Sequence, residues 1–345
     1  MKKYLLICLV FISCQDEIFI DFNNESSKIV VEGGIEQGMP PYVILSKNQG
    51  YFDEINTETY ENLFINDAVV KVWPTYTIEG PNDTITLERI PGLDFPIYSY
   101  LPYWQNIITP YAYEDPKFKN WSTPDRTFNL LVTYNNQEIT SQTTIPNPTP
   151  LDCLWVEKNE FSEQDFKYDI RALYNDPIDE QNNILIKNRR SENWQLDSLK
   201  ELKNEPDLFL DLIDAGSDIL INGQRFETYF PRKTNEGFPT GKFNGKRWKT
   251  YNFEGNLDST EVPGNVAIIK FCQIDESSLK LWRSIVRQGG SNGNPFQEPL
   301  NIVSNIEGGY GGWTGYGAVY YEVYIDEDSI NGPLPLNSIE ITDLF

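Results

Sequence analysis

The chain of 345 residues contains no histidine. Imidazole is the base or the metal ligand in Ser-His-Asp and Cys-His catalytic sites, in HExxH metalloproteases and in most catalytic zinc sites, so its absence excludes these enzymes. Basic residues are also scarce, with 28 Lys and Arg against 51 Asp and Glu and a net charge of −23. Nucleic acids and anionic lipid headgroups attract basic patches, so we expect neither as a partner.

Motifs for other chemistry are absent or lack their structural context. Gly289, Ser291 and Gly293 match the G-x-S-x-G pattern, but they follow a predicted helix, and no histidine exists to activate Ser291. The stretch GGYGGWTGYG at 308–317 holds six glycines but neither a G-x-G-x-x-G nor a P-loop signature. We expect its glycines to supply positive-φ turns, bulges and close backbone contacts, with its aromatic residues packing or facing a partner.

Two functions that use carboxylate oxygens, glycoside hydrolysis and calcium binding, do not require histidine. A glycosidase needs only two carboxylates, but nothing in the sequence singles out such a pair. The segment 175–183, NDPIDEQNN, is either a calcium-binding loop or a solvated one, and it lacks the spacing of an EF-hand. We predict a protein that is not an enzyme and that holds no metal or cofactor.

The N-terminus has the features of a secreted, lipidated protein. In residues 1–13, Lys2 and Lys3 precede an apolar run too short to span a bilayer, as in a signal peptide. Ser13 directly before Cys14 resembles a bacterial lipobox, in which Cys14 becomes acylated, although an ordinary signal peptide is the alternative. Residues 14–27 would then be a lipidated tether, and no later apolar run approaches the roughly 18 residues of a membrane span.

The residues after Cys14 bear on which side of the membrane the protein faces. Gln15, Asp16 and Glu17 resemble the acidic signal that sends lipoproteins of Bacteroidota to the cell surface. A polar tether without any signal is the alternative. We expect an outer-membrane protein that is held by its lipid alone and faces the cell exterior.

The rest of the chain predicts a mainly β fold in two domains. Strand patterns occur at 28–36, 42–46, 68–73, 83–88, 128–134 and 138–145, which favours an immunoglobulin-like β-sandwich over 28–146. The proline-rich segment 145–150 marks the expected boundary. Patterns at 166–174, 182–188, 218–230, 266–274 and 318–325 predict a second, antiparallel β domain over 151–345, with a turn at Asn222-Gly223. The segment 166–174 alternates an apolar face, from Phe166 to Tyr174, with a polar face that carries Lys167, Asp169 and Arg171, so it predicts a half-buried strand.

The second domain is predicted to carry one or two helices. A helix is expected near 276–288, because Asp275 can cap it, Leu279, Trp282 and Val286 recur at helical spacing, and Gly289 can end it. A second short helix is possible in 199–213, where Pro206 would break it. Cys153 and Cys272 are either one disulfide or two buried thiols.

A long aromatic insertion in the first domain is the predicted partner-binding segment. Residues 95–121 hold nine aromatics and four prolines, and loops of this length are usually functional. Equally, these rings could form a small core beneath the loop. The candidate binding residues are Tyr98, Tyr100, Tyr103, Trp104, Tyr111, Tyr113, Phe118 and Trp121.

The C-terminal run NPFQEPLNIVSNIEGGYGGWTGYG, at 294–317, carries a family resemblance. It is similar to the signature of Bacteroidota lipoproteins known as domain-of-unknown-function family 4249, and upstream segments such as VVEGGIEQG at 30–38 match in order. The signature residues here are Asn294, Pro295, Phe296, Glu298, Pro299, Asn305, Gly308, Gly309, Gly311, Trp313 and Gly315. The resemblance implies an outer-membrane lipoprotein encoded beside TonB-dependent receptors, with an immunoglobulin-like N-terminal module and no established catalytic residues.

Three functions compete at this point. The lipid anchor and the resemblance favour an accessory subunit of a TonB-dependent transporter or another outer-membrane β-barrel. The aromatic loop favours a free-standing glycan or peptide binder, or an adhesin. A carboxylate-driven hydrolase has the least support, because no acidic pair stands out.

Overall fold

The computed structural model describes most of the chain from residue 27 onward. The described residues are 27–49, 56, 59, 62–75, 83–90, 110–113, 121–159, 167–178, 180–190, 211–219, 221–231, 238–239, 244–251, 257–263, 265–291, 301–325 and 338–339. Residues 1–26, with the predicted signal peptide, Cys14 and most of the tether, lie outside this set, as does nearly all of the predicted helix at 199–213. At the end of that segment, residues 211–213 belong to a strand.

Strands form where the sequence alternates β-branched and polar residues, and the prediction of a mainly β fold is confirmed. The strands of the N-terminal segment are β1 (Ile29–Glu36), β2 (Tyr42–Lys47), β3 (Val69–Pro74), β4 (Ile85–Arg89), β5 (Tyr111–Ala112), β6 (Arg126–Tyr134) and β7 (Gln137–Ile145). On β6, Phe128, Leu130 and Val132 are buried while the residues between them are only partly covered, which is the period-two pattern of a strand with one face on a core.

The C-terminal segment adds eleven strands and one described helix. They are β8 (Cys153–Lys158), β9 (Lys167–Asn175), β10 (Asn183–Arg190), β11 (Asp211–Ser217), β12 (Arg225–Phe230), β13 (Phe238–Pro239), β14 (Asn244–Tyr251), β15 (Leu257–Pro263), β16 (Asn265–Ile274), α2 (Glu276–Ser291), β17 (Tyr310–Ile325) and β18 (Ser338–Ile339). Between β11 and β12, Gly223 has φ +72, as expected for the predicted Asn222-Gly223 turn.

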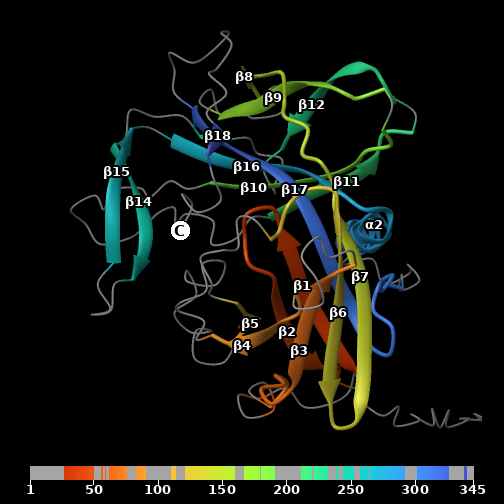
Figure 1. The fold of residues 1–345 in the computed structure, drawn as a ribbon. Coiled ribbons are helices and arrows are strands. Elements are labelled where there is room, and N and C mark those ends of the chain that lie inside the picture. Colours follow the sequence, from red (N-terminus) through yellow and green to blue (C-terminus); the bar gives the residue numbers. More distant parts are fainter. Residues whose placement is uncertain are drawn as a thin grey trace, which may run out of the picture.

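One large mixed sheet runs through both segments. Its twelve strands lie in the order β11-β10-β16-β17-β1-β2-β5-β4-β3-β6-β7, with β18 added beside β17. Strand β7, at the far end of this order, returns to β17, because the amide of Gly315 donates to Thr143 Oγ1 at 2.7 Å. The N-terminal strands therefore wrap around a core (Figure 1). A four-stranded sheet of β8, β9, β12 and β13 and the β14–β15 pair complete the described strands.

Strand β17 joins the two segments. Its first residues pair in parallel with β1, from Val30 beside Tyr310 to Glu36 beside Tyr316. Its later residues pair antiparallel with β16, up to Asn265 beside Ile325. A single strand of 16 residues thus connects the first strand of the fold to the centre of the C-terminal half (Figure 1).

The N-terminal core takes residues from beyond the predicted boundary at 145–150. Trp313 on β17 is fully buried in the same cluster as Val43, Val72 and Phe128, and Ile306 also belongs to it. The strands of 28–146 therefore do not close their own core, because its largest side chain is supplied by the C-terminal segment. The proline-rich segment separates the two halves in sequence, but β17 joins them in space.

Helix α2 begins where its capping residue predicts. Asp275 Oδ1 accepts the amide of Ser278 at 2.7 Å, while Oδ2 accepts the amide of Thr144 on β7 at 2.9 Å, so one carboxylate both caps the helix and fixes it to the sheet. The expected end at Gly289 is wrong, since the helix continues to Ser291. Ser291 is therefore the last residue of a helix and not the turn after a strand, so the G-x-S-x-G match lacks the geometry of a nucleophile elbow.

A second core lies between the small sheet and the C-terminal part of the large one. Tyr168, Ile170, Ala172 and Tyr174 alternate on the inner face of β9 and pack against β16 and β17. This is the face that the alternation in 166–174 predicted. Cys153 and Cys272 are both free thiols, and the Cys272 thiol is buried and donates to the carbonyl of Leu185 at 3.3 Å.

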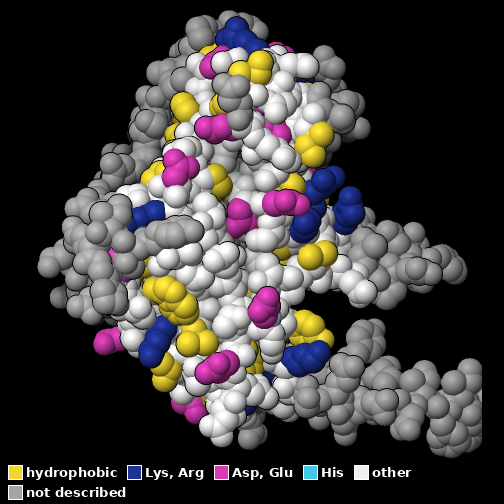
Figure 2. Space-filling view, turned by 45° about the vertical axis from the view of Figure 1, so that its right-hand side comes forward, with side chains coloured by type: hydrophobic (Ala, Val, Ile, Leu, Met, Phe, Trp, Pro, Cys, Tyr) yellow, Lys and Arg dark blue, Asp and Glu magenta, His cyan; other side chains and the backbone are white. Residues whose placement is uncertain are grey.

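The acidic character of the chain is dispersed over its surface. Figure 2 shows Asp and Glu side chains scattered across one face without forming a continuous block. No helix among the described residues is long and apolar enough to cross a membrane.

We predict that Gly311→Ala strongly destabilises the fold. Gly311 has φ +102, and a Cβ at this position would collide with the backbone carbonyl of Val31 on β1. Backbone strain and overpacking together should lower the free energy of unfolding by about 3 kcal/mol or more in urea titrations. Gly216→Ala on β11 is the matched control, because no atom lies within 4 Å of its Cβ position. Equal stability of the two variants would contradict the close pairing of β1 with β17.

Candidate functional site

The structure places three of the predicted partner-binding aromatics in the N-terminal core. Tyr111 is only 3% exposed, and its hydroxyl accepts the amide of Ala68 at 2.9 Å and donates to the carbonyl of Ile65 at 3.2 Å. For Tyr111 the partner-binding prediction is wrong, because its buried hydroxyl ties β5 to the segment before β3. Tyr113 and Trp121 are partly buried and pack against the same core. Tyr98, Tyr100, Tyr103, Trp104 and Phe118 lie outside the described residues.

The signature residues that the structure describes lie where β17 contacts β1 and β7, a region that we call the β17 seam. The side-chain amide of Asn305 pairs with the backbone of Trp313, donating to its carbonyl at 2.8 Å and accepting its N–H at 2.9 Å. The carbonyl of Asn305 in turn accepts the hydroxyl of Ser141 on β7 at 2.8 Å. A Cβ on Gly315 would collide with the carbonyl of Thr144, so β7 passes over β17 only where a glycine stands.

These contacts give the glycine-rich stretch an architectural role. Only Gly308 and Gly311 within it have positive φ, and from Tyr310 onward the stretch is strand, so close backbone approach rather than a turn is its main use. Asn294, Pro295, Phe296, Glu298 and Pro299 lie outside the described residues.

A buried charge network crosses the same seam. Lys270 Nζ on β16 binds Glu36 Oε2 on β1 at 2.6 Å, and the hydroxyl of Tyr320 on β17 donates to the same oxygen at 3.0 Å. The two charged side chains are 8% and 10% exposed, so each depends on the other for its counter-charge. The network is a second link between the first strand and the C-terminal half.

Lys187 is the unusual member of this region. It lies directly opposite Lys270 across β10 and β16, and its Nζ sits 4.2 Å from the ring centroid of Trp282 on α2. Burial, and then the neighbouring charge of Lys270, lower the pKa of Lys187 to about 8. Because the Trp282 ring lies over the Lys187 amine, Lys187 makes a cation–π contact with helix α2.

Asp176, in the segment weighed as a calcium-binding or solvated loop, is buried and organises two turns. Its carboxylate accepts the amide of Gly223 at 2.9 Å and the side-chain amide of Asn182 at 3.4 Å. The solvated interpretation is therefore wrong for this residue. No group of three or more His, Cys, Asp or Glu that could hold a metal ion occurs in the part of the chain that the structure describes.

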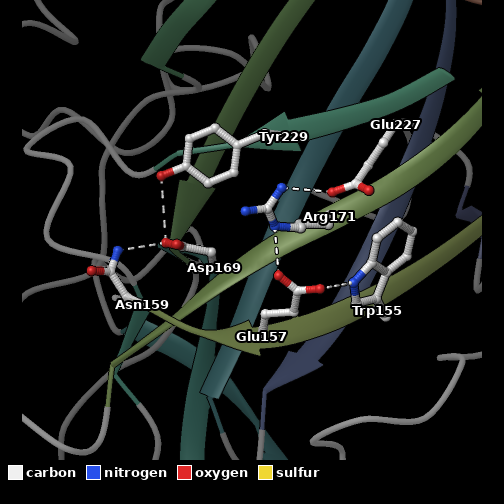
Figure 3. A network of polar contacts seen from close by, with 7 residues as sticks. All are labelled: Trp155, Glu157, Asn159, Asp169, Arg171, Glu227 and Tyr229. Carbon is white, nitrogen blue, oxygen red and sulfur yellow. Dashed lines mark hydrogen bonds and ion pairs between the residues drawn. The ribbon is translucent and has the colours of Figure 1, made fainter. Parts of the chain in front are cut away.

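The outer face of the small sheet carries the most distinctive surface group among the described residues. Trp155 on β8, Arg171 on β9 and Tyr229 on β12 form one row straight across three neighbouring strands. Their side chains point away from the second core, because the alternating residues Val156, Ile170 and Phe230 fill it. We call this group, with its neighbours Glu157, Asn159, Asp169 and Glu227, the outer-sheet patch (Figure 3).

Two carboxylates hold Arg171 in a fixed orientation. Its Nε lies 2.8 Å from Glu157 Oε2 and its Nη1 lies 2.6 Å from Glu227 Oε1, so the guanidinium is clamped from both sides (Figure 3). The other oxygen of Glu157 accepts the indole N–H of Trp155 at 2.8 Å. The Tyr229 ring centroid lies 5.5 Å from the guanidinium carbon. The patch is thus a rigid surface with one aromatic ring on each side of an arginine.

Asp169 anchors one edge of this patch. Its Oδ1 accepts the side-chain amide of Asn159 at 2.7 Å and faces the hydroxyl of Tyr229 at 3.5 Å. Burial raises the pKa of Asp169, and the hydrogen bond from Asn159 works in the opposite direction. With three carboxylates around one guanidinium, the outer-sheet patch has an excess of negative charge. Such a surface suits a neutral or cationic ligand that can stack on partly exposed rings.

The sequence had placed only part of the patch. Alternation in 166–174 put Asp169 and Arg171 on the polar face of their strand. Trp155 and Tyr229 were not singled out, although Tyr229 lies within the predicted pattern 218–230 and Trp155 stands between the apolar residues Leu154 and Val156. An aromatic residue at such a position is the signal that could have drawn attention to them.

Comparison with known proteins yields one match. A family model described as a domain of unknown function, DUF4249, matches residues 15–320. No curated protein gives a significant match to the chain.

The lowered pKa of Lys187 predicts a specific pH dependence of stability. Between about pH 8 and about pH 10.5 the unfolded chain binds a proton that the folded protein has released, so this lysine favours the folded state increasingly as the pH rises. The free energy of unfolding of the wild type, minus that of Lys187→Met, should therefore increase from pH 7 to pH 10 in urea titrations.

Lys71→Met serves as the control for this measurement, because Lys71 on β3 is exposed. A constant difference between the wild type and Lys187→Met across this pH range would show that Lys187 is not desolvated in the folded protein.

Proposed function

Because this chain belongs to the family described as a domain of unknown function, DUF4249, we propose that it acts by binding and not by catalysis. It is a lipid-anchored protein of the outer membrane, exposed at the cell surface, that serves as an accessory subunit of a β-barrel. A TonB-dependent transporter is the partner that the family resemblance favours.

The observation that carries the proposal is the N-terminal sequence MKKYLLICLVFISCQDE. A short apolar run ending in Ser13-Cys14 supports acylation of Cys14, and two or more acyl chains anchor a protein stably. Asp16 and Glu17 directly after the cysteine support exposure on the outer side.

The arrangement of the fold is consistent with an anchored binding protein. Lys28, at the start of β1, donates to the hydroxyl of Tyr310 at 2.8 Å, so the tether enters where β17 begins. The small sheet packs over the other end of β17, near Val323 and Ile325. Sixteen extended residues span about 50 Å. The outer-sheet patch therefore lies at the end of the molecule remote from the tether (Figure 1).

The two glutamates of the outer-sheet patch are paired with Arg171, an arrangement that suits ligand binding. Glu157 and Glu227 both form ion pairs with Arg171, which holds their carboxylates in place. This supports a role in binding over a carboxylate-driven hydrolase.

The outer-sheet patch also favours a second candidate, a free-standing glycan or peptide binder. Trp155 and Tyr229 stand two strands apart, which is about 10 Å, with charged groups between them. Rings so placed offer two stacking platforms to an extended ligand.

Copurification tests the accessory-subunit proposal. Lipoprotein tagged at its C-terminus and extracted in mild detergent should elute with a β-barrel protein in stoichiometric amount, identified by mass spectrometry. In Cys14→Ser the acylated thiol is lost, so the protein should leave the membrane fraction and lose its companion. Elution of the lipidated protein alone would count against an accessory subunit.

A glycan array separates the second candidate from the first. If the patch binds sugars, the wild type should bind defined glycans, and Trp155→Ala with Tyr229→Ala should weaken that binding about tenfold or more. Tyr310→Ala is the control, because Tyr310 is exposed but lies at the tether end. Binding that survives the double substitution would remove the patch from consideration.

A further inference from the structure

The outer face of helix α2 is basic in a strongly acidic protein. Lys280, Arg283 and Arg287 recur at spacings of three and four, so they share one face of the helix, and all three are exposed. In Figure 2, where this side of the molecule is turned forward, dark-blue side chains gather at the height of α2. The net charge of −23 makes this cluster an exception.

The ion pairs of the helix do not account for the two arginines. Lys280 Nζ pairs with Glu276 at 2.7 Å, but no carboxylate of the described residues lies within ion-pair distance of Arg283 or Arg287. Like charges three or four residues apart destabilise a helix. The helix macrodipole favours cations in the last turn, yet that turn contains no basic residue. The two arginines are therefore available to an external anion.

The basic face forms one wall of a pocket of about 240 Å³. The other wall is the segment that leads back toward β17. The lining residues are Lys280, Arg283, Ser284, Arg287, Asn301 and Val303. The hydroxyl of Ser284 accepts the amide of Val303 at 3.0 Å and donates to the carbonyl of Leu281 at 2.6 Å, so the two walls are held in a fixed relation.

An apolar side chain, Val303, adjoins the cations in this pocket. Val303 is 45% exposed, and Ile302, the residue before it, is 49% exposed but does not line the pocket. Arginine is enriched at protein interfaces, and the guanidinium fork suits a carboxylate. A ligand with both carboxylate and aliphatic side chains would satisfy the two kinds of wall together.

We propose that this α2 pocket docks an acidic segment of a partner protein, one that carries Asp or Glu next to aliphatic residues. Charge complementarity selects an anion, and the exposed Val303 in the pocket lining selects a peptide over inorganic phosphate. A membrane surface fits less well, because the N-cap of α2 contacts Thr144 beside Gly315, several residues along β17 from the tether end. The inference does not depend on whether the partner is an outer-membrane β-barrel.

Fluorescence anisotropy with the detergent-solubilised lipoprotein tests this proposal. The probe is a fluorescein-labelled peptide of repeated Glu-Leu-Glu-Ser, and a Lys-Leu-Lys-Ser peptide is its charge-reversed counterpart. We expect salt-sensitive binding of the acidic peptide, weakened about tenfold or more by Arg283→Glu with Arg287→Glu. Lys71→Glu with Lys158→Glu, which changes the net charge equally at exposed sites elsewhere, should leave binding within about twofold.

Several results would overturn the proposal. They are no binding of the acidic peptide to the wild type, equal binding to both double variants, and displacement of the peptide by inorganic phosphate at equal concentration. Displacement by vesicles of anionic phospholipid would instead assign the pocket to a membrane surface. Arg283→Gln with Arg287→Gln, which removes charge without reversing it, guards against a folding defect and should give an intermediate loss, with an unchanged circular dichroism spectrum.

Discussion

The parallel pairing of β1 with the glycine-rich start of β17 is the constraint on which the other features depend. Only a strand without side chains at Gly311 and Gly315 can lie this close to β1 on one side and to β7 on the other. The same strand then carries Trp313 into the N-terminal core and continues as the partner of β16. The Glu36–Lys270 ion pair and the capping carboxylate of Asp275 both lie across this seam, so packing, charge and helix position share one origin.

The sequence predicted local structure well because local structure depends on neighbouring residues. Alternation in 128–134 and 166–174 located strands and their buried faces, and Asp275 marked the start of α2. Pairing between distant strands leaves no such periodic trace. The parallel contact of β1 with β17 therefore escaped prediction, as did the burial of Tyr111, whose aromatic character suits a core and an interface equally.

The functional surfaces were predictable only in part, for a related reason. Alternation placed Arg171 on an exposed face, but the row it forms with Trp155 and Tyr229 depends on the register of three strands. Likewise, helical spacing aligns Arg283 with Arg287, whereas the wall opposite them comes from the return of the chain toward β17. Composition alone, with its large excess of acid, gave no indication of a local basic site.

The pairing of Val30 with Tyr310 also determines when the protein can fold. These partners are about 280 residues apart in the chain, so the N-terminal core lacks its central tryptophan until almost the whole polypeptide is present. Contacts of such high sequence separation form slowly. A fold that waits for its last long strand leaves the N-terminal segment without a closed core until β17 has been made. The architecture thus couples the completion of folding to the completion of the chain.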